Sequence, residues 1–331
     1  MEIPLVCILA GFRKPITMPF SPSIIRGFRL SLLFAAWVLL FPYRPMGQSP
    51  YSRQFIPVDG KKISYTSFGL KTRRPGEPVL VFEAGFSAGA VQNFACLYPG
   101  LSKNFAGVSY DRNGEGQSAE DSTLVTDKDL CRRLHTFLGL IHVAPPYILI
   151  GHSLGGPYIR LFTSLYPNEV DGLVFIDPPN YFRTAKQQEE LDRINPGAND
   201  LTRLHMEQTD SDTLLPPLQL HRNQRLLNTV FRDGYFAEYA SLPPLRDIPV
   251  AVLLTHNHRL QAIPDSSRKG HTIAEEDAVR RFRIENYTSL IENNHNSFIM
   301  ILPGYQHMVH SQDPELVVQV IERIYRKAKV K

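Results

Sequence analysis

Cysteine and tryptophan are scarce in this sequence, with three and one among 331 residues. Cys7 lies near the N-terminus, so Cys96 and Cys131 are the one pair that could form a disulfide in the rest of the chain. Both are expected on helices, and we predict two buried free thiols. No cysteine spacing is typical of a metal site. These features exclude a disulfide-rich scaffold and a cysteine-based zinc site.

An excess of charge is missing from most of the chain. Residues 1–47 carry five basic residues against the acidic Glu2, and the remainder carries 31 basic and 31 acidic residues. The basic balance is therefore a property of the N-terminal segment and gives no reason to expect nucleic acid as a partner. We expect a small-molecule partner instead.

An apolar run long enough to span a membrane is absent as well. The uncharged, strongly apolar stretch Leu30–Tyr43 has 14 residues, whereas a membrane-spanning helix needs about 20. Arg26 and Arg29 precede it, which is typical of a secretory signal peptide. We therefore predict that residues 1–47 are a signal peptide or an N-terminal anchor.

The fate of this segment depends on its cleavage. Arg44–Gln48 forms a poor cleavage site, and without cleavage residues 26–43 would anchor the protein to a membrane. We expect an exported protein, periplasmic or secreted, or a membrane-anchored one. Residues 1–17 precede the signal-like segment, and we expect Met18 to be the true start. The alternative is a buried apolar helix of the fold.

A serine stands where an apolar run stops abruptly. Tyr147–Ile150 has the length of a strand, Gly151-His152-Ser153-Leu154-Gly155 follows it, and an amphipathic segment of helical spacing begins at once. A tight turn between a strand and a helix strains its central residue and leaves room only for glycine nearby. We predict Ser153 to be a nucleophile beside a helix N-terminus. The alternative is an ordinary N-cap serine in a glycine-rich loop.

Strand-like and helix-like segments alternate along the chain after a hairpin predicted around Asp59-Gly60. This alternation indicates an α/β fold, a mostly parallel sheet covered by helices on both faces. It stops between residues 178 and 247, a polar stretch with helical patches. We predict that this stretch is a helical cap inserted into an α/β core of residues 48–177 and 248–331. The strands of the core are expected at residues 79–84, 107–110, 147–150, 172–177, 248–254 and 298–302.

A serine nucleophile needs a base, and the base needs an orienting acid. His307, one of 11 histidines, follows the last predicted strand. The carboxyl ends of parallel strands share one sheet edge, so this loop should lie near the serine. We predict His307 as the base, with His310 as the alternative. We predict Asp177, at a strand end, as the acid, with Asp265 as the alternative. A turn or helix-cap role is the other interpretation of Asp177.

Two backbone N–H groups are expected to hold the oxyanion that forms on acyl attack. Leu154, directly after the nucleophile, is predicted to supply one, and Phe86, in the loop after residues 79–84, is predicted to supply the other. His256 and His258 lie two apart at a strand end, but no third ligand has a convincing spacing. We therefore predict neither a metal nor a cofactor.

Four segments carry a family resemblance, namely Glu83-Ala84-Gly85-Phe86, Tyr110 to Ser118, Gly151 to Gly156, and His307 with Asp313 to Val317. They resemble those of the α/β-hydrolase-fold serine hydrolases, esterase- or lipase-like, over residues from about 52 to 328. The order serine, acid, histidine also agrees with the family. The resemblance implies an eight-stranded sheet with a helical cap after the sixth strand, here residues 178–247. The sequence departs from the family at Glu83-Ala84-Gly85, where His-Gly is more usual, and in lacking an acid directly after the seventh strand.

The type of nucleophile narrows the expected reaction. A serine in place of an aspartate disfavours the epoxide hydrolases and haloalkane dehalogenases of this fold. We predict a serine hydrolase that cleaves a carboxylic ester with an apolar part, through an acyl-enzyme. Amide hydrolysis, acyl transfer, and slow or non-catalytic ligand binding on the same fold are the alternatives.

Overall fold

The computed structural model describes residues 51–85, 89–124, 126–181, 183–196, 239, 241–256 and 271–329. The predicted signal or anchor segment lies outside the described residues, as do Phe86, Asp265, His258 and most of the predicted cap. The inferences that depend on them stay predictions. Within the described ranges, no helix is both long and apolar enough to cross a membrane.

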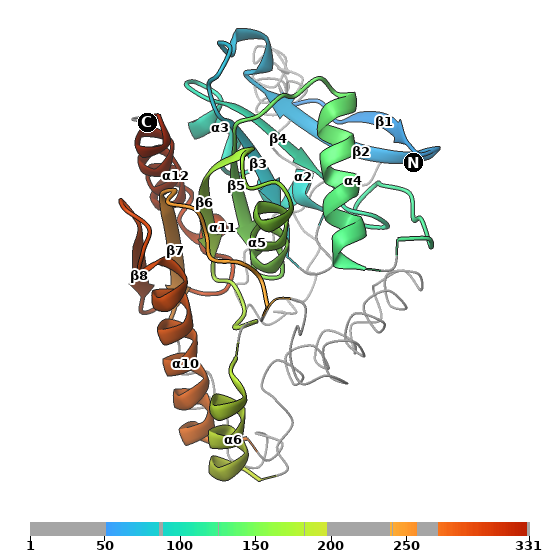
Figure 1. The fold of residues 1–331 in the computed structure, drawn as a ribbon. Helices are drawn as coiled ribbons and strands as arrows, with labels where there is room; N and C mark the ends of the chain where they lie inside the picture. Colours follow the sequence, from blue (N-terminus) through green and yellow to red (C-terminus); the bar gives the residue numbers. More distant parts are fainter. Residues whose placement is uncertain are drawn as a thin grey trace, which may run out of the picture. The chain divides into compact units, whose positions relative to one another are not determined.

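An eight-stranded sheet forms the centre of the molecule, in the order β1-β2-β4-β3-β5-β6-β7-β8 (Figure 1). β2 pairs antiparallel with both β1 and β4, and all the other neighbouring strands pair in parallel. This arrangement confirms the predicted mostly parallel sheet. The strands are β1 (Gln54–Val58), β2 (Lys61–Phe68), β3 (Val79–Glu83), β4 (Ala106–Tyr110), β5 (Tyr147–His152), β6 (Val170–Ile176), β7 (Val250–Thr255) and β8 (Phe298–Leu302).

Helices cover both faces of the sheet (Figure 1). The core on one face contains side chains of α4 (Asp127–Leu140), α5 (Gly155–Leu165) and α10 (Ile273–Ile291). The core on the other face contains side chains of α2, α3, α11 and α12. Their bounds are Ala90–Asn93 for α2, Tyr98–Leu101 for α3, Val309–Gln312 for α11 and Pro314–Ala328 for α12, while the 3-10 helix η1 spans Leu70–Thr72.

The position of β3 between two cores explains why its sequence is apolar as far as Phe82. Val79 and Val81 belong to the core on one face, whereas Leu80 and Phe82 belong to the core on the other. Successive side chains of a strand point to opposite faces, so a strand buried on both faces must be apolar throughout. Glu83 ends this run, and its carboxylate lies buried on the face of Val79 and Val81 with a charged partner described below.

Two sequence predictions about Cys96 are wrong. The sequence predicts a single helix through this residue, but it lies in a turn between α2 and α3. Pro99 accounts for the break, since proline lacks the N–H that a continuous helix would need there and is tolerated in the first turn of α3. Cys96 is exposed, whereas Cys131 is buried as predicted, and neither forms a disulfide.

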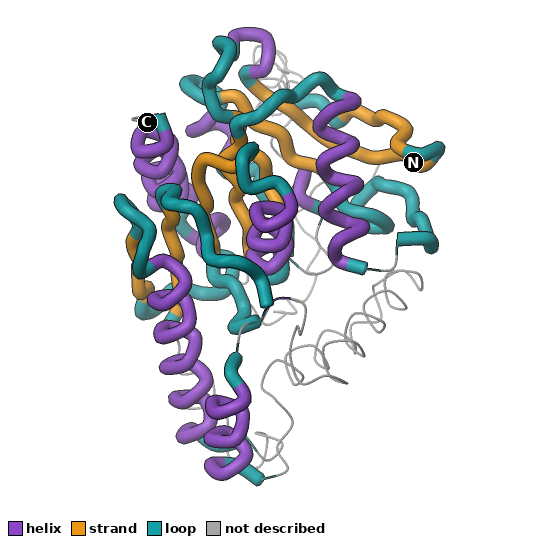
Figure 2. Tube along the Cα trace, in the orientation of Figure 1, coloured by secondary structure: helices purple, strands orange, loops and turns teal. Residues whose placement is uncertain are grey.

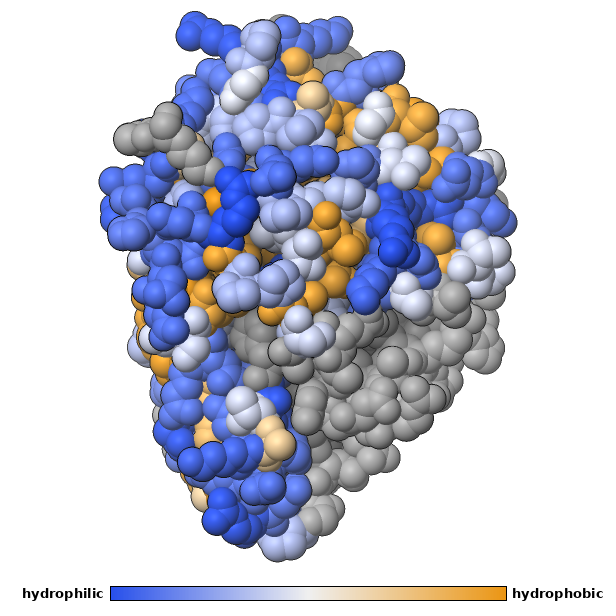
Figure 3. Space-filling view, viewed as in Figure 1, coloured by the Kyte–Doolittle hydropathy of each residue, from blue (hydrophilic) through white to orange (hydrophobic). Residues whose placement is uncertain are grey.

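One helix of the predicted cap region is described. α6 (Ala185–Ile194) lies between β6 and β7 in the sequence and packs beside α10 (Figure 2). Leu191 of α6 shares a small apolar cluster with Ala278 and Phe282 of α10. Among the described residues on the face that bears α4, α5 and α10, hydrophilic ones predominate, with small groups of hydrophobic residues between them (Figure 3).

Candidate active site

The predicted nucleophile occupies a strained turn between β5 and α5. Ser153 has a φ of 50°, in the left-handed region that non-glycine residues rarely adopt. Its N–H donates to the carbonyl of Ile176 at 2.9 Å, which ties the turn to the end of β6. A Cβ at Gly155 would lie 2.2 Å from the carbonyl oxygen of Glu83, so α5 can approach β3 only with glycine there. The side chain of Ser153 remains partly accessible.

Asp177 and His307 come together at this sheet edge. Asp177 follows β6 with a φ of 44°, another strained position, and His307 lies in the loop after β8. The Nδ1 atom of His307 lies 2.6 Å from Oδ2 of Asp177. Since an ionised carboxylate can only accept, Nδ1 carries the proton and Nε2 of the neutral ring is an acceptor. A base that takes a proton from serine needs this tautomer.

The surroundings of Asp177 hold its carboxylate in the ionised form. Oδ1 accepts from the N–H and the hydroxyl of Thr255, both at 2.9 Å, and lies 3.1 Å from Nη1 of Arg283. Burial by itself raises the pKa of Asp177, but the contacts with His307, Arg283 and Thr255 outweigh it and lower the pKa. The buried acid therefore keeps its charge opposite the imidazole.

His152, the residue before Ser153, contacts the histidine loop. Its Nε2 lies 3.0 Å from the main-chain carbonyl of His307, and because a carbonyl only accepts, Nε2 must be the donor. The ring centroids of His152 and His307 are 4.7 Å apart. Burial, followed by the nearby histidines His307 and His310, lowers the pKa of His152 well below its usual value. One neutral imidazole thus joins the serine turn to the histidine loop.

His310, the alternative base, has a different environment. It is fully buried, and its Nε2 bonds to Oδ1 of Asn93. Its ring packs against Phe94, with centroids 5.0 Å apart. Burial, and then the proximity of His307, lowers its pKa to about 4. Of the two histidines, His307 is the one that the structure places beside Asp177.

Leu154, the predicted donor to the oxyanion, is the N-cap residue of α5. The first N–H groups of a helix have no partner within it and carry a partial positive charge. The backbone there is therefore suited to hold a negative oxygen.

Sequence reasoning missed three residues of this site, namely His152, Thr255 and Arg283. Thr255 and Arg283 bind the carboxylate of Asp177, but they belong to β7 and to the middle of α10, where no local pattern marks them. His152 stood in the variable position of the serine motif. The signal that could have identified it is its place beside the nucleophile at a strand end.

The strand order, the helices on both faces and the serine turn after β5 define the α/β-hydrolase fold. Residues 78–239 match the family model of this fold. A norfluorocurarine synthase 2 from a Strychnos species is 26% identical over 261 residues, which cover 75% of this chain and 95% of that protein. The chain is therefore an enzyme of the α/β-hydrolase fold.

Solved structures show the same fold. A putative lipase from Acinetobacter baumannii has a TM-score of 0.57 at 18% identity, covering 94% of this chain and 99% of that one. The carboxylesterase CesB of Bacillus subtilis has a TM-score of 0.51 at 15% identity, covering 83% and 91%. At these identities the similarity extends to the fold alone.

Proposed function

We propose that this hydrolase cleaves a carboxylic ester with Ser153 as nucleophile, His307 as base and Asp177 as orienting acid. The observation that carries the proposal is the 2.6 Å contact between His307 Nδ1 and Asp177 Oδ2, beside a serine held at positive φ. Buried Asp177 keeps the tautomer in which Nε2 can accept the serine proton.

The reaction then follows in two steps. Nε2 of His307 takes the proton of Ser153 Oγ as this oxygen attacks the ester carbonyl carbon, and the carbonyl oxygen becomes an oxyanion. The N–H of Leu154 stabilises the oxyanion together with the predicted donor at Phe86. Protonated His307 returns the proton to the alcohol as it leaves, which forms the acyl-enzyme. A water molecule deprotonated by His307 repeats the attack and releases the carboxylic acid and the serine.

An acyl bond as the target is in keeping with the names of two proteins that share the fold. One is named a putative lipase and the other a carboxylesterase. A serine nucleophile is suited to esters, amides and acyl transfer alike. We place the ester first because the described site shows no feature that would select a peptide.

Covalent labelling tests this proposal. A fluorophosphonate should label the wild-type protein and leave Ser153→Ala unlabelled, with equal unfolding midpoints for the two proteins. Ser164→Ala is a control, because the Ser164 hydroxyl donates to Leu161 within α5. An unlabelled wild type would favour a ligand-binding role and contradict the proposal.

A hydrolysis screen then identifies the bond. p-Nitrophenyl esters of increasing acyl length, an anilide of the same acids and a lactone would be compared by kcat/KM. We expect the highest values among the esters. A higher kcat/KM for the anilide or the lactone would contradict the assignment to carboxylic esters while leaving the nucleophile intact.

A further inference from the structure

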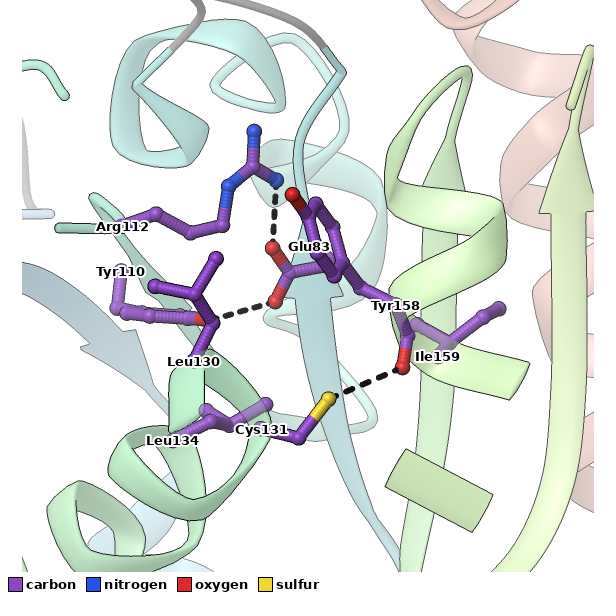
Figure 4. Close-up of a pocket in the computed structure, with 8 residues that line it drawn as sticks. All are labelled: Glu83, Tyr110, Arg112, Leu130, Cys131, Leu134, Tyr158 and Ile159. Atoms are coloured by element: carbon purple, nitrogen blue, oxygen red, sulfur yellow. Dashed lines mark hydrogen bonds and ion pairs between the residues drawn. The ribbon is translucent and has the colours of Figure 1, made fainter. Parts of the chain in front are cut away.

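A buried cluster of charges lies directly behind the end of β3. Arg112, which is 2% exposed, pairs with Glu83 at 2.6 Å and with Glu115 at 2.8 Å. Tyr110 also donates to the second oxygen of Glu83, at 2.6 Å (Figure 4). Burial acts against the charge of Arg112, but the two carboxylates outweigh it and raise the pKa of Arg112. The guanidinium is therefore charged.

The same guanidinium holds the main chain that follows β3. Nη1 of Arg112 donates to the carbonyl of Ala84, and Nη2 donates to the carbonyl of Gly85 at 2.5 Å. Gly85 lies against the serine turn, since a Cβ there would be 3.0 Å from both His152 Nδ1 and Ser153 Cβ. Arg112 thus fixes two carbonyls at the point where β3 approaches the nucleophile.

Asp111, the preceding residue, holds the chain on the other side of residues 86–88. Its Oδ1 accepts the N–H of Val91 at 3.2 Å, at the start of α2. A Cβ at Gly89 would lie 2.6 Å from this oxygen, so the backbone packs directly on the carboxylate. Two adjacent side chains therefore secure the residues that flank the predicted oxyanion donor.

The cluster has no room for a ligand of its own. A pocket of about 10 Å³ lies beside it, lined by Glu83, Tyr110, Arg112, Leu130, Cys131, Leu134, Tyr158 and Ile159 (Figure 4). This volume is close to the minimum for a single water molecule. The polar groups of the cluster therefore bind other groups of the protein rather than a ligand.

We propose that Arg112 is a positioning residue that aims the second oxyanion donor, with Glu83 as its counter-charge. This inference rests on the proposed hydrolase function. A peptide group is planar and almost always trans, so a fixed carbonyl fixes the N–H on the other side of the same group. The carbonyl of Gly85 belongs to the peptide group that carries the predicted second donor. By holding this carbonyl, Arg112 orients that peptide group.

The chemistry of arginine explains why this residue is suited to the task. Its planar fork donates to four oxygens here, those of Glu83, Ala84, Gly85 and Glu115. A lysine ammonium has three donors around a single point and cannot reproduce the fork. Glu83, the first residue of the Glu83-Ala84-Gly85 stretch that replaces the more usual His-Gly, supplies the negative charge that a buried guanidinium requires.

The test compares Arg112→Lys with Arg133→Lys. Arg133 is a matched control, because it is also buried, pairs with Asp121 at 2.8 Å and donates to the carbonyl of Val58 at 2.6 Å, away from β3 and the serine turn. kcat and KM would be measured with p-nitrophenyl butyrate, per active site titrated with a fluorophosphonate. We expect a loss in kcat on the order of 10²-fold for Arg112→Lys with KM little changed. We expect kcat within about twofold of wild type for Arg133→Lys.

A phenylboronic acid provides a second measurement, because its tetrahedral adduct with Ser153 places an oxygen where the oxyanion forms. Its inhibition constant should rise for Arg112→Lys in proportion to the loss in kcat, and stay unchanged for Arg133→Lys. Equal losses in the two variants would overturn the inference. If Arg112→Lys does not fold, Arg112→Gln replaces it, with the same expectation. A wild type that neither labels nor hydrolyses esters would instead contradict the proposed function.

Discussion

The imidazole of His152 donates to the main-chain carbonyl of His307, with 3.0 Å between Nε2 and the oxygen. His152 is also the residue before Ser153, so its bond joins the chain on either side of the proposed proton transfer. Such transfers depend on distance, and a displacement of about 1 Å can cost on the order of 10²-fold in rate. The position of the base therefore depends on a side chain of the nucleophile strand.

Replacing His152 should change turnover more than stability. We expect His152→Leu to lower kcat on the order of 10²-fold, because the donor to the His307 carbonyl is lost. His152→Gln carries an amide donor at a similar reach and should recover kcat to within about tenfold of wild type. Ester hydrolysis and thermal unfolding would be measured for both variants. Equal kcat values for the two would show that this hydrogen bond does not position the base.

Asp177→Asn should lower kcat on the order of 10⁴-fold, because the amide favours the wrong tautomer of His307. Asp265→Asn, at the alternative acid predicted from the sequence, serves as the comparison and should keep wild-type kcat. The measurement is the rate of ester hydrolysis at neutral pH. A large loss in Asp265→Asn with an active Asp177→Asn would reverse the assignment.

The carboxylate of Asp177 should also affect how the free energy of unfolding changes in acid. The folded-state pKa of Asp177 lies below its unfolded value near 4, so the folded state binds fewer protons in acid. Its stabilisation is fully present above pH 4 and is lost as pH falls through the folded-state pKa. The free energy of unfolding of Asp177→Asn should therefore approach that of wild type as pH falls below 4. A difference that stays constant down to pH 2 would contradict this expectation.

His310 should destabilise the fold in mild acid. Its folded-state pKa of about 4 lies below the ordinary 6.5, so between these values the unfolded chain binds a proton that the folded protein does not. Stability should fall as pH decreases from 6.5 to 4, by up to about 3 kcal/mol. His310→Gln keeps a partner for Asn93 and should flatten this decline. Urea unfolding at several pH values tests this expectation.

Replacing two glycines by alanine should change the free energy of unfolding in opposite directions. Gly155→Ala would push a methyl group into the carbonyl of Glu83 and should destabilise the protein by about 3 kcal/mol. Gly139 is exposed in α4 without a positive φ, and a Cβ there would meet no atom within 4 Å, so Gly139→Ala should stabilise by about 0.5–1 kcal/mol. Free energies of unfolding in urea measure both. A neutral Gly155→Ala would refute the close approach of α5 to β3.

Local patterns in the sequence were sufficient for most of the fold. The buried strands could be predicted because they are short apolar runs between turn residues, as in β3 and β5. The start of α4 follows a threonine, a common helix-start residue, and in the structure Thr126 is the N-cap in a capping box with Asp129. The turn at Cys96 was missed because an apolar, helix-compatible stretch outweighed the single signal of Pro99.

The residues of the site also differ in whether a local sequence signal identifies them. His307 and Asp177 could be predicted together because each follows a parallel strand, and parallel strands deliver their ends to one edge. Arg283 and Glu83 could not be assigned, since their partners Asp177 and Arg112 lie far away in the sequence. A charge on a helix or at a strand end is usually solvated, and only the tertiary structure shows that these two are paired.

β8, which pairs with β7, is the last strand of the sheet to be synthesised. The loop that carries His307 follows β8, so a ribosome delivers the proposed base long after the nucleophile and the acid have emerged. A nascent chain released before this strand would hold a serine in its strained turn without a partner to deprotonate it. The enzyme would thus stay inactive during its synthesis until β8 and the loop after it have been made and have joined the sheet.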